Sequence, residues 1–168
     1  LDRRMSLIWR RREHKLFERF DLLSVCSESD RDYLGGGSHV TVIPNGYAPV
    51  SSIPLPSPVS PPRLGFIGTF NWRPNAEGVE WFLRSVWSLI REKCPDVELR
   101  LVGLGSRRRF STVGPGISPL GFVEDPGPEI ASWTAMVVPI RIGGGTRIKI
   151  AEAFARRCPV VSTSLGAL

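Results

Sequence analysis

The segment from Gly143 to Glu152 holds the residue types and spacing that most directly indicate chemistry in this chain. Three successive glycines, 143–145, follow an apolar run and lead into a helical pattern, so the backbone there can approach a ligand closely. Free N–H groups and the positive end of the dipole at a helix start form a site for an anion such as phosphate. Thr146 is placed to cap this helix. We therefore predict an anion-binding turn in this segment.

Charged residues in the first turn of that helix strengthen the prediction. Arg147 and Lys149 put positive charge where the helix dipole disfavours it, unless an anion balances it. Glu152 follows one turn after Lys149, where it can pair with the lysine or accept hydrogen bonds from sugar hydroxyls near the phosphate. A glycine-rich turn with a surface salt bridge explains the same residues without a ligand, and the pattern alone leaves both interpretations open.

The composition is that of an ordinary globular protein. The 168 residues have a formal net charge of +6 and are 42% hydrophobic, which argues against disorder, collagen and coiled coil. The three cysteines are far apart and lack metal-ligand spacing, so we expect buried thiols in a reducing compartment. No apolar run is long enough to span a membrane, and we predict a soluble, cytoplasmic protein. Because the chain begins at Leu1 rather than Met, we expect a fragment of a longer protein.

The first twenty residues are a strongly basic helical segment. They contain seven arginines and lysines, and apolar residues recur along one side of the expected helix at Met5, Ile8, Trp9, Leu16 and Phe20. Such a helix can bind peripherally to anionic lipid at the inner face of a membrane, but an ordinary helix with a solvated basic face is the favoured interpretation. No helix-turn-helix, zinc-finger or RNA-binding signature accompanies the charge, so we expect no nucleic-acid partner.

Composition divides the chain into three parts, residues 1–46, a proline-rich linker over residues 47–62, and residues 63–168. Expected strands are 21–26, 39–43, 63–67, 97–102, one near Phe122, 135–140 and 159–163, and expected helices start at Ser27 and cover 76–93, 129–133 and 147–157. The alternation predicts an α/β fold with a Rossmann-like, doubly wound parallel sheet. Asn75 is the expected N-cap of its helix.

Two further motifs give weak signals. Gly103-Leu-Gly105 could approach a phosphate, but it lacks a third glycine and a clear helix after it. Asp30-Arg-Asp32 has the form of an Asp-x-Asp metal motif, yet it falls in an expected helix start, where acidic residues need no metal. We therefore expect no metal site.

Taken in order, several motifs resemble those of the family 4 (group 1) glycosyltransferases, and the resemblance covers almost the whole chain. They are Ser27 with Asp30 after a strand, 43–46 (Ile-Pro-Asn-Gly), 65–68 (Gly-Phe-Ile-Gly), Pro74-Asn75 before a helix, 101–103, 121–123, the glycine-rich 143–149 (Gly-Gly-Gly-Thr-Arg-Ile-Lys), Glu152-Ala153, and 159–163. The glycine-rich sequence is typical of a subgroup. The family has the two-domain GT-B fold, which implies that residues 1–46 end the acceptor-binding half and residues 63–168 form most of the donor-binding half.

The resemblance implies transfer of a glycosyl group from a UDP- or GDP-linked sugar to an acceptor, with retention of configuration and without a metal or other cofactor. The acceptor could be a carbohydrate, a lipid-linked sugar or a small molecule. Glu152 matches the second glutamate of the family's motif, whereas Gly144 stands where the first is expected. The implied donor-binding residues are Gly68, Arg73, Phe122, Val123, Gly143, Gly144, Gly145, Thr146, Arg147, Lys149 and Glu152.

In this assignment Arg73 and Lys149 share the diphosphate, and the nucleobase lies beside Gly121-Phe-Val123. The sequence identifies no catalytic residue, since the family's acceptor half is mostly absent, and we expect residues 1–168 alone to be inactive. Two alternatives stay open, a non-catalytic nucleotide-binding remnant and a nucleotide-sugar epimerase or phosphorylase of the same fold.

Overall fold

The computed structural model describes residues 3–17, 19–46, 57 and 59–167. The chain divides into two units, one comprising residues 1–46 with 144–146 and the other comprising residues 47–143 with 147–168. Most of the expected proline-rich linker, residues 47–56 and 58, lies outside the described residues.

The first unit contains two helices and a short parallel sheet. Its elements are α1 (Arg3–Phe17), β1 (Leu23–Val25), α2 (Glu28–Tyr33) and β2 (Val40–Val42). Leu23 pairs with Val40 in parallel register. The side chain of Ser27 caps α2 by accepting a hydrogen bond from the Asp30 N–H at 3.1 Å, which confirms the expected helix start.

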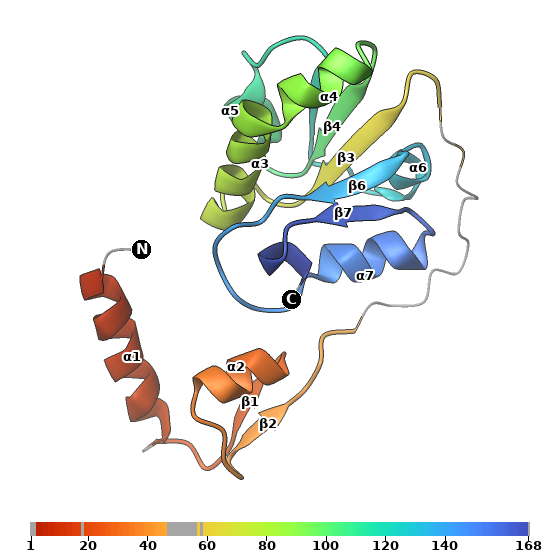
Figure 1. The fold of residues 1–168 in the computed structure, drawn as a ribbon. Coiled ribbons are helices and arrows are strands. Elements are labelled where there is room, and N and C mark those ends of the chain that lie inside the picture. Colours follow the sequence, from red (N-terminus) through yellow and green to blue (C-terminus); the bar gives the residue numbers. More distant parts are fainter. Residues whose placement is uncertain (1–2, 18, 47–56, 58, 168) are drawn as a thin grey trace. The chain divides into compact units, whose positions relative to one another are not determined.

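The second unit is built on a five-stranded parallel sheet (Figure 1). Its strands are β3 (Arg63–Ile67), β4 (Glu98–Val102), β5 (Ile117–Gly121), β6 (Ala135–Val138) and β7 (Val160–Ser162). The order is β5-β4-β3-β6-β7, so the chain starts in the middle, runs to one edge and then returns to fill the other side. This doubly wound order reverses between β3 and β6, and it confirms the predicted α/β fold class.

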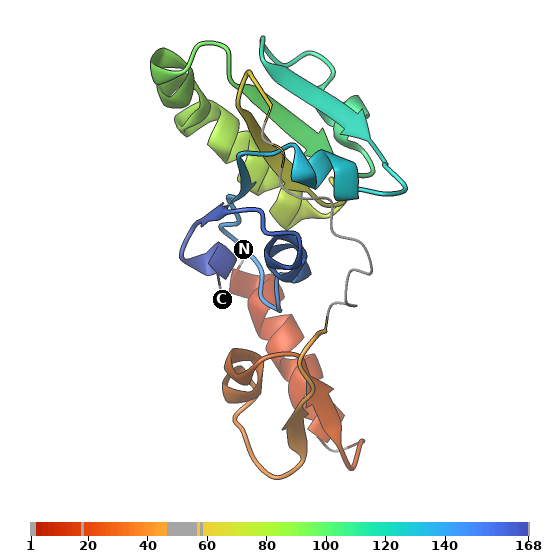
Figure 2. The same ribbon diagram turned by 90° about the vertical axis from the view of Figure 1, so that its right-hand side faces the viewer.

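Helices connect successive strands of this sheet. They are α3 (Arg73–Ser85), α4 (Trp87–Lys93), α5 (Ser106–Phe110), α6 (Gly127–Ala131) and α7 (Ile148–Ala155), followed after β7 by a 3₁₀ turn, η1 (Leu165–Ala167). Figures 1 and 2 show α3 and α4 on one face of the sheet and α6 and α7 on the other. Each face of the sheet is therefore covered, as parallel sheets require.

The helix expected over residues 76–93 is two helices. The first begins three residues earlier than expected, and the break lies at Val86. Phe82 and Trp87, five residues apart, would point about 140° away from each other on one straight helix. Because the helix breaks between them, both side chains are buried and their ring centroids lie 6.4 Å apart.

The sheet forms the centre of the hydrophobic core. Phe66, Leu99, Leu101, Met136 and Val138 are fully buried along the three central strands. On the face that carries α6, a β-carbon added at Gly65 would come within 2.0 Å of the Trp133 indole, so only glycine leaves room for that ring.

The cysteines differ in how deeply they are buried. All three cysteines are free, but only Cys158 is buried, and Cys26 and Cys94 are half-buried. The expectation of three buried thiols was therefore wrong for two of them, which lie beside element ends rather than in the sheet. No helix among the described residues has the length and apolar character to cross a membrane.

Candidate functional site

The loops that leave β3 and β6 meet at the carboxyl end of the sheet, where the strand order reverses. A β-carbon added at Gly143, in the loop after β6, would lie 3.2 Å from Cγ of Pro74 in the first turn of α3. Gly78 of α3 leaves no room for a side chain against the carbonyl of Pro139. In doubly wound folds, ligands bind in the crevice at this reversal. A ligand site is therefore expected among the side chains at the carboxyl end of the sheet.

Lys149 brings a positive charge to this crevice from the first turn of α7. Its Nζ donates a hydrogen bond to Oδ1 of Asn75 at 2.9 Å and lies 4.0 Å from the centre of the Phe66 ring. Phe66 belongs to β3 and Asn75 to α3, so one ammonium group joins three elements of the second unit. The contact with the ring face is a cation–π interaction, which stabilises the charged form.

The surroundings of Lys149 destabilise the charged form of its amine. Burial and, to a lesser extent, the nearby positive charge of Arg147 lower the pKa of Lys149 from the ordinary 10.5 to about 7. A bound anion would favour the charged form and raise that pKa again. A lysine with a strongly lowered pKa at a crevice is a candidate for a binding or catalytic role.

Asn75 has a different role from the one expected. We predicted it as the N-cap of its helix, but Trp72 occupies that position and Asn75 lies in the first turn. Its Nδ2 donates to the carbonyl of Thr69 at 2.8 Å, which leaves Oδ1 directed at Lys149. Asn75 thereby fixes the lysine relative to the loop after β3, a role that the sequence pattern did not reveal.

Gly68 provides space next to the ammonium group. A β-carbon at this position would lie 3.0 Å from Nζ of Lys149 and 2.8 Å from Nδ2 of Asn75. The structure thus brings two predicted site residues, Gly68 and Lys149, into contact. Arg73, also predicted, is the exposed first residue of α3 in the same end of the sheet.

The glycine-rich turn differs from prediction at the helix start. The helix α7 begins at Ile148, with Arg147 rather than Thr146 in the N-cap position, because the helical pattern starts one residue later than expected. Nη2 of Arg147 donates to the carbonyl of Gly143 at 3.0 Å and closes the turn. Gly144, Gly145 and Thr146 group with the first unit, and their assignment to the donor site stays a prediction.

Glu152 pairs along its own helix. Its Oε1 lies 3.6 Å from Nε of Arg156, and both side chains are nearly buried at 13% and 11% exposure. Lys149, one of the two partners predicted for Glu152, donates its hydrogen bond to Asn75, and the predicted contact of Glu152 with sugar hydroxyls stays a prediction. The i,i+4 spacing places Arg156 on the same side of α7 as Glu152, and this partner was missed by the sequence analysis.

The carboxyl ends of β4 and β5 lie at the same end of the sheet, on the far side of β3 from β6. Gly103 donates its N–H to the carbonyl of Gly121 at 2.7 Å, and Gly121 donates to the fully buried Oγ of Ser106 at 2.8 Å. Phe122 is 68% exposed, whereas Val123 is half-buried. The Gly103-Leu-Gly105 turn leads directly into the five-residue helix α5, although the sequence showed no helix pattern there.

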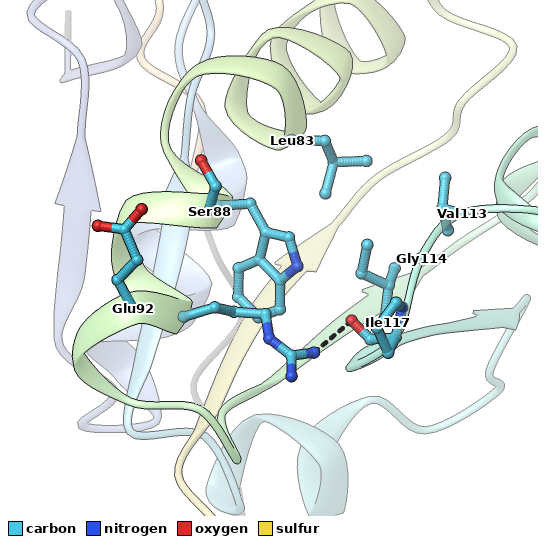
Figure 3. Close-up of a pocket in the computed structure, with 9 residues that line it drawn as sticks. Leu83, Ser88, Glu92, Val113, Gly114 and Ile117 are labelled. Atoms are coloured by element: carbon cyan, nitrogen blue, oxygen red, sulfur yellow. Dashed lines mark hydrogen bonds between the residues drawn. The ribbon is translucent and has the colours of Figure 1, made fainter.

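A separate hollow lies at the opposite end of the sheet. A cavity of about 550 Å³ lies where β5 begins (Figure 3), and its lining includes Leu83, Trp87, Arg91, residues 113–115 and Ile117. Nη1 of Arg91 donates to the carbonyl of Pro115 at 2.6 Å across one side of it. None of the predicted site residues lines this cavity. This cavity is therefore distinct from the end of the sheet that carries Lys149.

The groups around Lys149 at this end of the sheet are suited to hold an anion. They include a half-buried ammonium group, an exposed arginine, glycine backbone at a strand end and the start of an eight-residue helix. Such groups stabilise negative charge that is bound, or that develops on a leaving group.

Comparison with known proteins agrees with this fold. The family model for "Glycosyl transferases group 1" matches residues 61–168. A search of curated protein sequences gives no match. Among solved structures, TarM of S. aureus is 15% identical with a TM-score of 0.72, over 88% of this chain and 31% of that one.

Two further solved structures are similar. Alr3699/HepE of Anabaena is 19% identical with a TM-score of 0.64, over 94% of this chain and 48% of that one. WaaG, a glycosyltransferase involved in lipopolysaccharide biosynthesis, is 16% identical with a TM-score of 0.61, over 85% of this chain and 44% of that one. The chain thus spans less than half the length of each of these structures, and their likeness bears on the GT-B fold alone. The match of the family model shows that the chain belongs to the group 1 glycosyltransferases.

Proposed function

We propose that this chain forms the donor-binding part of a glycosyltransferase that uses a nucleotide sugar, and that Lys149 binds the donor diphosphate. The single observation that carries the proposal is the position of the Lys149 ammonium group, half-buried at the reversal of the strand order and held by Asn75. An isolated buried cation is unfavourable, but a diphosphate would compensate its charge. The family to which the chain belongs supports this interpretation.

The chemical task follows from the position of that charge. When a glycosyl group leaves its donor, negative charge develops on the departing nucleoside diphosphate. Lys149, Arg73 and the N–H groups at the start of α7 would stabilise this charge. We propose that they take the part that a metal ion plays in other transferases, and that transfer proceeds with retention, as the family resemblance implies.

The donor is proposed to be a UDP- or GDP-linked hexose. Solved structures of Alr3699/HepE contain UDP with glucose, or UDP-glucose, which supports a uridine donor. The acceptor is proposed to be a carbohydrate, a lipid-linked sugar or a small molecule, bound by parts of a longer protein.

Calorimetric titration of the chain with UDP-glucose and GDP-mannose tests the proposal. We expect one of them to bind, and the Lys149→Met variant to bind it at least about tenfold more weakly, because a charge-assisted hydrogen bond is lost. Lys93→Ala is the matched control, since it removes one positive charge from the last turn of α4. Absence of binding, or equal affinity in Lys149→Met, would contradict the proposal, provided that circular dichroism shows a folded variant.

We also propose that the basic helix α1 contacts anionic lipid at the cytoplasmic face of a membrane. Leu7, Ile8 and Trp9 are 60%, 44% and 50% exposed on it, next to Arg10 and Arg11. Such a mixture of apolar and basic side chains suits the boundary between headgroups and acyl chains. Co-sedimentation with vesicles that contain or lack phosphatidylglycerol tests this point. Binding that does not depend on the anionic lipid would contradict it.

A further inference from the structure

A strip of bare backbone crosses the carboxyl ends of three neighbouring strands in the second unit. Gly68, Gly103 and Gly121 follow or end β3, β4 and β5. A β-carbon added at Gly103 would collide with the carbonyl oxygen of Gly68 at 2.1 Å, and the Gly103 N–H binds the carbonyl of Gly121 at 2.7 Å. The three glycines are therefore in direct contact, one after another.

A positive side chain lies at each end of this strip. Nζ of Lys149 lies 3.0 Å from the position of a β-carbon at Gly68, and Nε of Arg107 lies 3.1 Å from that of a β-carbon at Gly121. Strands in a sheet are about 4.8 Å apart, so three strand ends span roughly 10 Å. The strip thus has a cation at each end, and the glycines between them contribute backbone but no side chains.

Arg107 differs from the two arginines that follow it on α5. Arg108 donates to Oδ1 of Asn71 at 3.4 Å, and Arg109 pairs with Glu80 at 2.7 Å. Within the part of the chain that the structure describes, Arg107 makes neither a hydrogen bond nor an ion pair, and its side chain is exposed. Its guanidinium group is held against the strand end and retains its donors for a ligand.

The residue that follows Gly121 in the sequence carries an exposed aromatic ring. Phe122 directly follows Gly121 and is 68% exposed. Nucleobases stack on aromatic side chains, and a guanidinium group donates hydrogen bonds but cannot accept them. A base that presents a carbonyl oxygen, such as O4 of uracil or O6 of guanine, would therefore be preferred to one that presents an amino group there.

From these contacts we infer that Arg107 selects the nucleobase of the donor, and that it favours the oxo bases uracil and guanine over the amino bases adenine and cytosine. This inference rests on the proposed function, because it takes the diphosphate to lie at Lys149. The phosphates and the base of a nucleoside diphosphate are separated by one ribose, which would lie over Gly103. Arg107 is then a specificity-determining residue rather than a further phosphate ligand.

Calorimetric titration of the chain with UDP, GDP, CDP, ADP and inorganic pyrophosphate tests the inference. The wild-type chain should bind UDP or GDP at least about tenfold more tightly than CDP and ADP. In Arg107→Gln, whose amide both donates and accepts, this ratio should fall to within about twofold while the affinity for pyrophosphate stays the same. Arg108→Gln, on the same helix, is the matched control and should keep the wild-type ratio.

The outcomes separate this inference from the proposal on which it rests. Unchanged base discrimination in Arg107→Gln overturns the inference alone, as does an equal loss of affinity for pyrophosphate, which would make Arg107 a phosphate contact. The proposed function itself fails if the wild-type chain binds no nucleoside diphosphate. It also fails if Lys149→Met binds every nucleoside diphosphate with the wild-type affinity.

Discussion

Nζ of Lys149 lies 2.9 Å from Oδ1 of Asn75, a contact between residues 74 positions apart in the sequence. It links the first turn of α7 to the first turn of α3, on the two sides of the point where the strand order reverses. Asn75 is itself fixed by the hydrogen bond that it donates to Thr69. The ammonium group is thus positioned before any ligand binds, and such preorganisation favours both binding and electrostatic catalysis.

The lowered pKa of Lys149 should appear as a dependence of stability on pH. Between about pH 7 and the ordinary lysine pKa of 10.5, the unfolded chain binds a proton at this position that the folded chain lacks. This group therefore makes the folded state more stable as pH rises through that range, by at most about 1.4 kcal/mol per pH unit. Lys149→Met removes the contribution.

Urea unfolding of wild type and Lys149→Met at pH 7, 8 and 9 measures the contribution of Lys149 to the pH dependence of stability. The free energy of unfolding of the wild type should increase relative to the variant as pH rises. A constant difference between the two proteins across this range would show that Lys149 has an ordinary pKa.

The Arg100–Glu129 pair should stabilise the second unit at neutral pH. Nη2 of Arg100 lies 2.6 Å from Oε1 of Glu129, and Nε1 of Trp133 donates to Oε2 of the same carboxylate at 3.2 Å. Burial alone would raise the pKa of Glu129, but the hydrogen bond and charge of Arg100 outweigh it and lower the pKa below 4.5. The stabilisation is therefore present above the ordinary glutamate pKa and is lost as pH falls through the lowered pKa.

Thermal denaturation of Glu129→Gln tests whether the Arg100–Glu129 pair stabilises the fold at neutral pH and loses this effect in acid. The variant should be less stable than the wild type by about 1 to 3 kcal/mol at pH 7, since a hydrogen-bonded, partly buried charge pair is broken. The difference should shrink at acid pH, where the wild-type carboxylate becomes protonated. An equal deficit at pH 7 and at pH 3 would argue against the charge as its cause.

Gly65→Ala should destabilise the sheet. The added β-carbon would lie 2.0 to 2.2 Å from three atoms of the Trp133 indole, which is 1% exposed and has no room to move. Overpacking of this kind costs about 1 to 3 kcal/mol. Gly114→Ala is the control, because a β-carbon there meets nothing within 4 Å. Similar melting temperatures for the two variants would contradict the packing described for Trp133.

Removal of divalent metal ions should leave donor binding unchanged. If Lys149, Arg73 and the start of α7 supply the positive charge for the diphosphate, excess EDTA should alter the affinity for a nucleotide sugar by less than about twofold. Titration in EDTA and in added magnesium measures this. Binding that requires magnesium would replace the proposed metal-independent mechanism.

The sequence was sufficient to predict four strands of the second unit, because each contains a short apolar run. The strand expected near Phe122 lies earlier, at Ile117–Gly121, where serine, proline and glycine interrupt the apolar pattern. Arg63–Ile67 was placed without error, and the helix at Glu28 was located from its cap, Ser27. The break at Val86 could not be foreseen, since it depends on two aromatic side chains that reach the same core only after folding.

The candidate site was predicted in part. Gly68 and Lys149 were both singled out, and the fold brings them together. Asn75 was assigned to a cap because its type and position suit one, and only the fold shows that its amide lies between Thr69 and Lys149. Arg107 was missed because its significance comes from contact with Gly121, fourteen residues away, and no local pattern records such a contact.

Proton uptake on binding shows whether Lys149 receives the donor diphosphate. At pH 8 a lysine with a pKa of about 7 is mostly neutral, and a bound diphosphate should return it to the charged form. Titrations with UDP-glucose or GDP-mannose in buffers of different ionisation enthalpy count the protons taken up. The wild type should take up close to one proton and Lys149→Met none, whereas equal uptake in both proteins would show that the diphosphate does not bind at Lys149.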